Sequence, residues 1–313
     1  MGQLEKKSML PRALFRATVR LGWRQFLRRQ GRARWTPGLV VFPLLKRLVG
    51  NKVTARLGGQ VRYAVSGGAA LPFPVAKTFI GLGLEILQGY GLTETSPVIT
   101  VNRPGHNDPA SVGEPLRGME VRIGENDELL VKSPGIMLGY WNNHAATAEM
   151  IDPDGWLHTG DQARIEDGCV YITGRIKDIL VLSNGEKVPP ADMEAAICMD
   201  PLFDQALVLG EGRAWLGALL VLNSDLWFGF ARESGLDPFQ RESLEDDRLQ
   251  RKVLARVRQQ LHDFPGYAKI RRAVLTLEPW TVENGLLTPT LKVKRAKVLE
   301  QCADQVEALF EER

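Results

Sequence analysis

Hydrophobic and polar residues recur with a helical period near the start of the chain. Arginines occupy every fourth position from residue 12 to residue 28. An apolar stripe runs beside them, formed by Phe15, Val19, Trp23 and Phe26. This spacing predicts an amphipathic helix over residues 10–29. Residues 30–47 stay basic, and we expect Pro37 and Pro43 to break regular structure there.

From residue 61 the pattern changes to strand, turn and helix. Residues 61–65 alternate in polarity, residues 66–70 contain a glycine turn, and Pro72 opens a predicted helix. The apolar stretch 84–87 is bounded by glycines, as is typical of a buried parallel strand. These segments predict a βαβ arrangement whose two glycine turns lie at one sheet edge, where open parallel sheets bind ligands.

The rest of the chain carries two further patterns. Residues 110–175 contain short segments of alternating polarity separated by glycine and proline, which predict a small β-subdomain. Residues 176–313 alternate strands with polar helices, an α+β pattern. We therefore expect an α/β fold in four parts: a basic arm (1–60), part of a parallel-sheet subdomain (61–109), the β-subdomain (110–175) and a C-terminal α+β domain (176–313).

Composition narrows the class of protein. At 313 residues the chain exceeds a typical single domain. Its three cysteines are widely spaced and odd in number, which argues against a disulfide framework and fits a reducing cytoplasm. The four histidines are too scattered for a zinc site. No apolar run approaches the length of a transmembrane helix, and the arginines from residue 12 onward exclude a signal-peptide core.

The net charge of +3 conceals an uneven distribution. Residues 1–62 hold fifteen Lys and Arg against the single acid Glu5, a charge of +14, so the remainder carries −11. A basic amphipathic helix at 10–29 can make a peripheral contact with an anionic membrane surface. It can equally pack its aromatic face on its own domain. We expect a cytoplasmic protein. We expect no specific nucleic-acid partner, because no recognised nucleic-acid module accompanies the charge.

The strongest candidate chemistry follows the 84–87 strand. Tyr90 stands between two glycines and offers a flat face on which a planar base can stack. Thr93 can donate to a phosphate oxygen, and Glu94 is a hard oxygen ligand of the kind that Mg²⁺ accepts beside substrate phosphates. Further along, Asp161 follows a glycine and can accept hydrogen bonds from two ribose hydroxyls. Alone, each of these residues is also explained by an ordinary turn.

Six segments in this order resemble those of the adenylate-forming (AMP-binding) superfamily, and within it the long-chain fatty acid–CoA ligases and acyl-carrier-protein synthetases. The segments are Ser66–Leu71, Gly89–Pro97, Pro134–Trp141, Gly155–Asp161, Gly174–Asp178 and Asn284–Arg295. The stretches 181–187 and 285–290 look more like the long-chain branch than the short-chain one.

The resemblance implies a role for each matching residue. Lys292 would be the catalytic lysine of a mobile C-terminal domain, and Lys177 would be the hinge of that domain. Thr93 would contact the α-phosphate, and Glu94 would bind the magnesium ion. The residues implied in nucleotide binding are Gly67, Gly68, Ala69, Tyr90, Gly91, Asp161 and Arg175.

The activity implied by the resemblance is a two-step ligase reaction. ATP activates a long-chain fatty acid as acyl-AMP, and the acyl group passes to the thiol of CoA or of an acyl carrier protein, with ATP, Mg²⁺ and CoA as cofactors. Two alternatives are left open: a non-catalytic membrane-surface fragment, and an adenylate-forming enzyme for another acid, such as an aryl-acid ligase or a luciferase-like oxygenase. The residues do not decide the acid's chain length, the thiol acceptor or the oligomeric state.

The chain departs from the family in one respect. The family's Gly-, Ser- and Thr-rich phosphate loop lies well upstream of the Tyr90 segment, and no stretch of this sequence matches it. The resemblance covers the C-terminal half of a synthetase, so we expect a fragment, a split gene or a mis-assigned start, with the N-terminal half as a missing partner on which the basic arm would pack. We predict that the 313-residue chain alone does not form acyl-adenylate at a useful rate.

Overall fold

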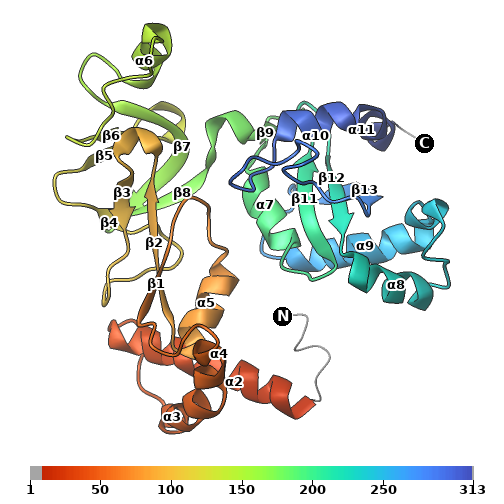
Figure 1. Ribbon diagram of the computed structural model, residues 1–313, viewed down its shortest axis with the longest axis horizontal. Coiled ribbons are helices and arrows are strands. Elements are labelled where there is room, and N and C mark those ends of the chain that lie inside the picture. Colours follow the sequence, from red (N-terminus) through yellow and green to blue (C-terminus); the bar gives the residue numbers. More distant parts are fainter. Residues whose placement is uncertain (1–8, 312–313) are drawn as a thin grey trace. The chain divides into compact units, whose positions relative to one another are not determined.

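The computed structural model describes residues 9–311 of the chain. They fall into two compact units, Met1–Ile176 and Lys177–Arg313, coloured red to green and green to blue in Figure 1. Among the helices in the described range, none has both the length and the apolar character needed to cross a bilayer.

The first sheet of the first unit has the strand order β1-β2-β3-β4. Its strands are β1 (Tyr63–Ser66), β2 (Glu85–Gly91), β3 (Val98–Val101) and β4 (Glu114–Pro115). β1 and β2 run parallel and are connected by α5 (Phe73–Leu82), so the βαβ arrangement expected from the sequence is confirmed. β3 and β4 continue the sheet antiparallel and were not expected. The last residues of β1 and β2 meet in register, with Ser66 opposite Gln88.

Helix α2 (Met9–Arg29) packs against α5, and both lie in the lower part of Figure 1. Gly22 and Gly81 allow the close approach, because a Cβ at either position would overlap backbone atoms of the opposite helix. Trp23 stacks on Phe26, with ring centroids 5.1 Å apart, and meets the edge of Phe73 at 5.6 Å. The sequence allowed two interpretations of this helix: contact with a membrane surface, or packing of its aromatic face on its own domain. The structure shows the packing.

The expectation that prolines break regular structure in residues 30–47 is wrong for both of them. Pro37 begins a 3₁₀ helix, η1 (Pro37–Val40), and Pro43 is the second residue of α3 (Phe42–Leu45). Proline is favoured in a first helical turn because its missing N–H would have no intrahelical partner there. A π turn, η2 (Lys46–Gly50), and α4 (Asn51–Ala55) continue the helical path.

The second sheet of this unit is antiparallel and has the order β5-β6-β7-β8. Its strands are β5 (Glu120–Ile123), β6 (Glu128–Lys132), β7 (Leu157–Glu166) and β8 (Cys169–Arg175). These match the alternating segments read from the sequence. Short helical turns accompany the two sheets: η3 (Thr93–Thr95), η4 (Glu125–Asp127) and α6 (His144–Met150). Ile99 of β3 joins Leu129, Val131, Ala163 and Val170 in one buried cluster, so the two sheets share a core.

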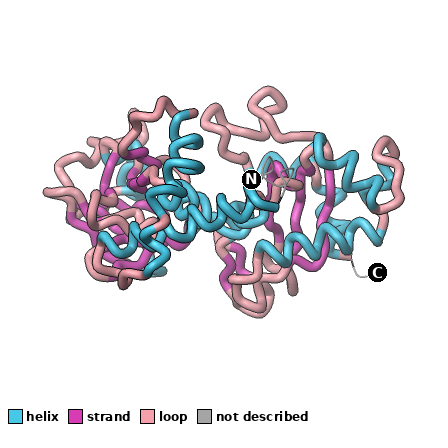
Figure 2. Tube along the Cα trace, turned by 90° about the horizontal axis from the view of Figure 1, so that it is seen from below, coloured by secondary structure: helices cyan, strands magenta, loops and turns pink. Residues whose placement is uncertain are grey.

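The second unit is a three-stranded sheet with helices on both faces, seen as magenta strands flanked by cyan helices in Figure 2. Its strands are β11 (Phe203–Leu209), β12 (Leu216–Leu222) and β13 (Ile270–Thr276). Its helices are α7 (Pro190–Ile197), α8 (Ser224–Glu233), η6 (Arg241–Leu244), α9 (Asp247–Gln260), α10 (Arg295–Gln301) and α11 (Ala303–Phe310). A small hairpin, β9 (Leu180–Val181) with β10 (Lys187–Val188), precedes them. Alternate strand residues enter two separate apolar clusters, one under α7, α8 and α9 and the other under α10 and α11.

Candidate active site

The carboxylate of Asp161 is the centre of the candidate site. Asp161 lies in β7, and its side chain is only 7% exposed. Tyr90 Oη donates a hydrogen bond to Oδ2 at 2.5 Å, and Arg175 Nε donates to Oδ1 at 2.9 Å. Arg175 is opposite Asp161 in the β7–β8 register, which explains the second contact. Three residues that the resemblance connects with nucleotide binding are therefore in direct contact.

Tyr90 takes part through its hydroxyl as well as its ring. The ring packs beside the cluster around Ile99. Burial raises the pKa of the Tyr90 phenol, and the negative charge of Asp161 and the hydrogen bond to it raise the pKa further. The phenol is therefore neutral at physiological pH and acts as a hydrogen-bond donor. The stacking of its face on adenine stays a prediction.

The backbone before Asp161 is held by Glu128, which the sequence reading missed. Glu128 Oε1 accepts a hydrogen bond from Gly160 N, and Oε2 lies 2.8 Å from His158 Nδ1. Thr159 Oγ1 donates to the Leu129 carbonyl at 2.7 Å and accepts from Asp161 N at 3.1 Å. These contacts tie the segment before Asp161 to β6. Nothing in the local sequence around Glu128 distinguishes it, because its role depends on the pairing of β6 with β7.

The glycine turn after β1 reaches the end of β2, as the sequence predicts. Leu71 N donates to Gln88 Oε1 at 3.1 Å. A Cβ built on Gly67 would lie 3.5 Å from the Gly89 carbonyl oxygen. Residues 67–69 are exposed. The turn at 66–69 and the loop that begins at Tyr90 therefore lie at the same edge of the sheet.

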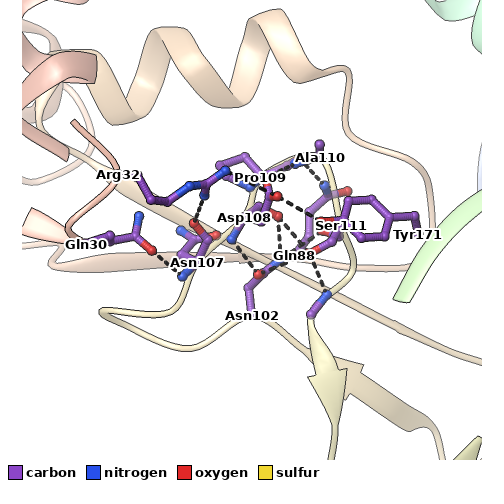
Figure 3. Close-up of polar contacts among 11 residues, drawn as sticks. Gln30, Arg32, Gln88, Asn102, Asn107, Asp108, Pro109, Ala110, Ser111 and Tyr171 are labelled. Carbon is purple, nitrogen blue, oxygen red and sulfur yellow. Dashed lines mark hydrogen bonds and ion pairs between the residues drawn. The ribbon is translucent and has the colours of Figure 1, made fainter. Parts of the chain in front are cut away.

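A polar network shown in Figure 3 surrounds Gln88. Gln88 Nε2 donates to the Pro109 carbonyl at 2.9 Å, and Asn102 Nδ2 donates to the Ser111 carbonyl at 2.8 Å. Asp108 accepts hydrogen bonds from Arg32 Nη2 at 3.4 Å and from Tyr171 Oη at 3.0 Å. Burial and the Asp108 contact raise the pKa of Tyr171 to about 12, so Tyr171 is a neutral donor. The network connects the residues after α2 to the end of β2.

Glu94 is oriented by a segment far away in the sequence. Tyr140 Oη donates to Glu94 Oε1 at 2.9 Å, and Met137 N donates to the Glu94 carbonyl at 2.8 Å. Burial and the contact with Glu94 raise the pKa of Tyr140. Tyr140 received no role from the sequence, although it lies within one of the matching segments, Pro134–Trp141. Thr93 is exposed beside Glu94 in η3.

The backbone between Tyr90 and Glu94 depends on glycine. A Cβ on Gly91 would overlap the carbonyl of Pro97, where the chain turns back antiparallel into β3. Gly91 is thus required by packing whether or not it touches a nucleotide.

The side chains present can bind a magnesium ion only in one way, through a single carboxylate. Within residues 9–311 no group of three or more His, Cys, Asp or Glu residues could hold a metal. Glu94 uses one carboxylate oxygen for Tyr140 and has lone pairs left for a cation. This fits an ion bound by one protein carboxylate together with substrate phosphates and water.

The two predicted lysines belong to the second unit. Lys177 is the first residue of that unit and is exposed in η5 (Ile176–Asp178). Lys292 is exposed in a tight loop, where Thr288 N donates to the Lys292 carbonyl at 2.8 Å and Lys292 N donates to Thr288 Oγ1 at 3.0 Å. Their roles as hinge and catalytic lysine stay predictions.

Arg295 anchors the loop that carries Lys292. Its Nη2 donates to Glu194 Oε1 at 2.5 Å, and its Nη1 donates to the Val208 carbonyl at 2.8 Å. The same Glu194 oxygen accepts from Val208 N at 2.8 Å. Burial raises the pKa of Glu194, while Arg295 and the Val208 N–H oppose that rise. The pair therefore ties the start of α10 to α7 and β11.

Solved structures of other proteins share this fold. The A domain of carboxylic acid reductase from Segniliparus rugosus, solved with AMP and a co-purified carboxylic acid, aligns with 95% of this chain and 46% of its own. The TM-score is 0.69 at 23% identity. The fold is that of adenylate-forming enzymes.

Two family profiles match the chain and identify its family. The profile of the AMP-binding enzyme family matches residues 23–141, and that of the AMP-binding enzyme C-terminal domain matches residues 177–313. The chain belongs to the AMP-binding enzyme family. The match begins at residue 23, well before residue 61, where the sequence motifs begin.

Several curated relatives are named as ligases of long-chain fatty acids. Long-chain-fatty-acid–CoA ligase FadD15 of Mycobacterium bovis is 36% identical over 280 residues, which are 88% of this chain and 46% of the relative. The chloroplastic long-chain-fatty-acid–[acyl-carrier-protein] ligase AEE15 of Arabidopsis thaliana is 28% identical over 85% of this chain and 38% of its own length. The chain thus spans about half the length of the curated relatives it matches.

Proposed function

We propose that this chain is part of an AMP-forming long-chain fatty acid ligase that transfers the acyl group to CoA or to an acyl carrier protein. The chain would supply the residues that bind the ribose and the magnesium ion, and the catalytic lysine. The unit Lys177–Arg313 would be the mobile C-terminal domain, with Lys177 as its hinge. The family's phosphate loop would come from an N-terminal half that this sequence does not contain.

The proposed chemistry has two balanced steps. A carboxylate oxygen of the fatty acid attacks the α-phosphorus of ATP, the bond to the bridging oxygen breaks, and pyrophosphate leaves. The thiol sulfur then attacks the acyl carbon, its proton is lost, and AMP leaves. A bound magnesium ion would supply charge neutralisation at the phosphates. Positioning and electrostatic stabilisation are what such transfers require from the protein.

Each residue in the proposal has a chemical task that its side chain can perform. Asp161, oriented by Tyr90 and Arg175, would accept hydrogen bonds from the ribose hydroxyls. Thr93 would donate to the α-phosphate. Lys292, a compact point charge, would bridge the carboxylate and phosphate oxygens during the first step and withdraw before the second.

One observation carries the nucleotide part of the proposal: the buried carboxylate of Asp161 and the Tyr90 loop meet beside the 66–71 turn. In open parallel sheets this edge, outside the carboxyl ends of the strands, is where ligands bind. The turn residues Gly67, Gly68 and Ala69 are exposed and can line a nucleotide.

A fusion enzyme tests the proposal. The unmatched N-terminal half of the Mycobacterium bovis relative is placed upstream of this chain, and fatty-acid-dependent ATP–pyrophosphate exchange is measured. We expect exchange in the fusion, none in the 313-residue chain alone, and a loss of about 100-fold on Lys292→Ala. Lys269→Ala, at another exposed lysine of the same unit, is the matched control. Family-typical exchange by the 313-residue chain alone would contradict the need for the other half.

We also propose that residues 10–29 contribute a peripheral contact with an anionic membrane through their arginines. Arg16, Arg20 and Arg24 are exposed, beside a groove lined in part by Trp23 and Lys77. The aromatic stripe is engaged with α5, so the contact available to α2 is electrostatic. Vesicle binding that disappears at high salt and survives Lys292→Ala would support it.

A further inference from the structure

Strand β7, which carries Asp161, is irregular against both of its neighbours. Its pairing with β6 shifts in register after Glu128, so that Leu129 alone lies opposite residues 159–161. Its pairing with β8 shifts directly after Gln162. Bulges of this kind interrupt the ladder of backbone hydrogen bonds, and next to active sites they re-aim a side chain. The candidate ribose acceptor Asp161 therefore lies in a segment that regular pairing with β6 does not hold.

Packing does not fix the residue before Asp161 either. Gly160 has a φ of 69°, in the left-handed region that favours glycine. A Cβ built at this position would meet no heavy atom of the described chain within 4 Å beyond its immediate neighbours. The backbone at Gly160 thus has room to rotate, and a rotation there would displace the Asp161 carboxylate. Hydrogen bonds have to hold this conformation in place.

The side chain of Glu128 provides that constraint. Its Oε1 accepts a hydrogen bond from Gly160 N at 2.8 Å, and its Oε2 lies 2.8 Å from His158 Nδ1. The Glu128 side chain is only 16% exposed. Hydrogen bonds to an ionised carboxylate are about twice as strong as those between neutral groups. Glu128 therefore binds the residues on both sides of Thr159, in the segment that leads into Asp161.

We propose that Glu128 is a positioning residue for ribose recognition. By holding Gly160, it sets where the Asp161 carboxylate lies. Tyr90 and Arg175 then orient the two carboxylate oxygens. The inference rests on the proposed role of Asp161 as acceptor for the ribose hydroxyls, and it adds a residue that acts without touching the nucleotide. Without an acceptor at position 128, the site should distinguish poorly between nucleotides with and without ribose hydroxyls.

Amide hydrogen exchange of the full 313-residue chain tests the positioning. Glu128→Met keeps the length of the side chain and removes both acceptors, whereas Glu128→Gln keeps an acceptor for Gly160 N. We expect the Gly160 amide, read from peptides covering residues 157–163, to exchange at least about tenfold faster in Glu128→Met. Glu128→Gln should exchange close to the parent rate. Glu120→Met, at an exposed glutamate of β5, is the matched control.

Nucleotide discrimination by the fusion enzyme tests the function. Fatty-acid-dependent pyrophosphate exchange is measured with ATP and with 2′,3′-dideoxy-ATP. The parent fusion should prefer ATP, and Glu128→Met should raise KM for ATP about tenfold while KM for the dideoxy nucleotide and kcat stay nearly unchanged. Glu128→Gln should retain the parent preference. Circular dichroism checks that each variant is folded, and Glu128→Ala is the second variant should Glu128→Met unfold.

The outcomes separate positioning from a structural role. Parent-like exchange of the Gly160 amide, or an unchanged preference for ATP, in the folded variant without acceptors would overturn the proposal. Equal losses with both nucleotides would overturn it as well, because they would assign Glu128 to the stability of the sheet. A parent fusion that uses both nucleotides equally would remove the ribose role of Asp161 and, with it, this proposal. A parent fusion without any exchange activity would count against the ligase proposal alone, and amide exchange in the 313-residue chain still decides whether Glu128 holds Gly160.

Discussion

The hydroxyl of Tyr90 and the carboxylate of Asp161, which are 71 positions apart in the chain, are joined by a hydrogen bond of 2.5 Å. The bond connects the end of the parallel βα unit to the antiparallel sheet that carries Asp161. A buried carboxylate with two donors is held in one orientation, which is what a ribose-binding acceptor needs.

Replacing Tyr90 by Phe should lower the stability of the chain. The change leaves one oxygen of the buried Asp161 carboxylate without its donor, and hydrogen bonds to charged groups contribute about 1.5–3 kcal/mol. We expect a loss of about 2 kcal/mol in the free energy of unfolding, measured by urea denaturation. Tyr63→Phe, at a tyrosine 49% exposed in β1, should change it by less than about 0.5 kcal/mol. Equal effects of the two variants would contradict the inferred strength of the bond.

Replacing Tyr140 by Phe should weaken magnesium use in the fusion enzyme. The Tyr140 hydroxyl orients the Glu94 carboxylate, and loss of such a supporting contact typically reduces metal affinity at least about tenfold. The Mg²⁺ concentration that gives half the maximal exchange rate should rise by about that factor. Tyr267→Phe in the second unit serves as control. A Mg²⁺ dependence identical to that of the parent fusion would remove Tyr140 from the orientation of Glu94.

Replacing Arg295 by Met should strongly destabilise the second unit. Glu194 would be left as a largely buried, uncompensated carboxylate, and breaking such a pair costs about 3–5 kcal/mol. Adding Glu194→Gln should recover part of the loss, which a double-mutant cycle in urea measures. Arg271→Met, at an exposed arginine of β13, is the control and should be nearly neutral. Additive effects of the two changes would show that Glu194 and Arg295 do not interact energetically.

Stability should fall at alkaline pH in part through Cys198. Burial, with smaller contributions from Glu194 and Asp204, raises the pKa of its thiol from 9.0 to about 11. The folded chain therefore holds this proton more tightly than the unfolded chain. The stabilisation is complete below pH 9.0 and is lost as pH rises towards 11, by on the order of 2 kcal/mol. Between these pH values, the free energy of unfolding measured in urea should decline less steeply for Cys198→Ala than for the parent chain. Parallel declines would contradict the assignment.

Residues close together in the sequence determined much of the fold. The four-residue arginine period predicted the helix now seen as Met9–Arg29, and alternation with bounding glycines predicted β1, α5 and β2 in parallel pairing. Periodicity and turn chemistry are local properties, so they can be read without knowing what lies opposite. The ordered motifs likewise identified the AMP-binding family, which the family profiles confirm.

Only the tertiary structure decided which side chains meet. The Tyr140–Glu94 and Arg295–Glu194 contacts span 46 and 101 residues. Each depends on strand register and loop packing that no local pattern encodes. The tertiary structure also decided that the aromatic stripe of α2 packs on α5, and that Val40, Val41, Leu44 and Leu48 face solvent. An apolar period in the sequence predicts that a helix has a face to be covered. Which residues cover that face depends on the tertiary structure.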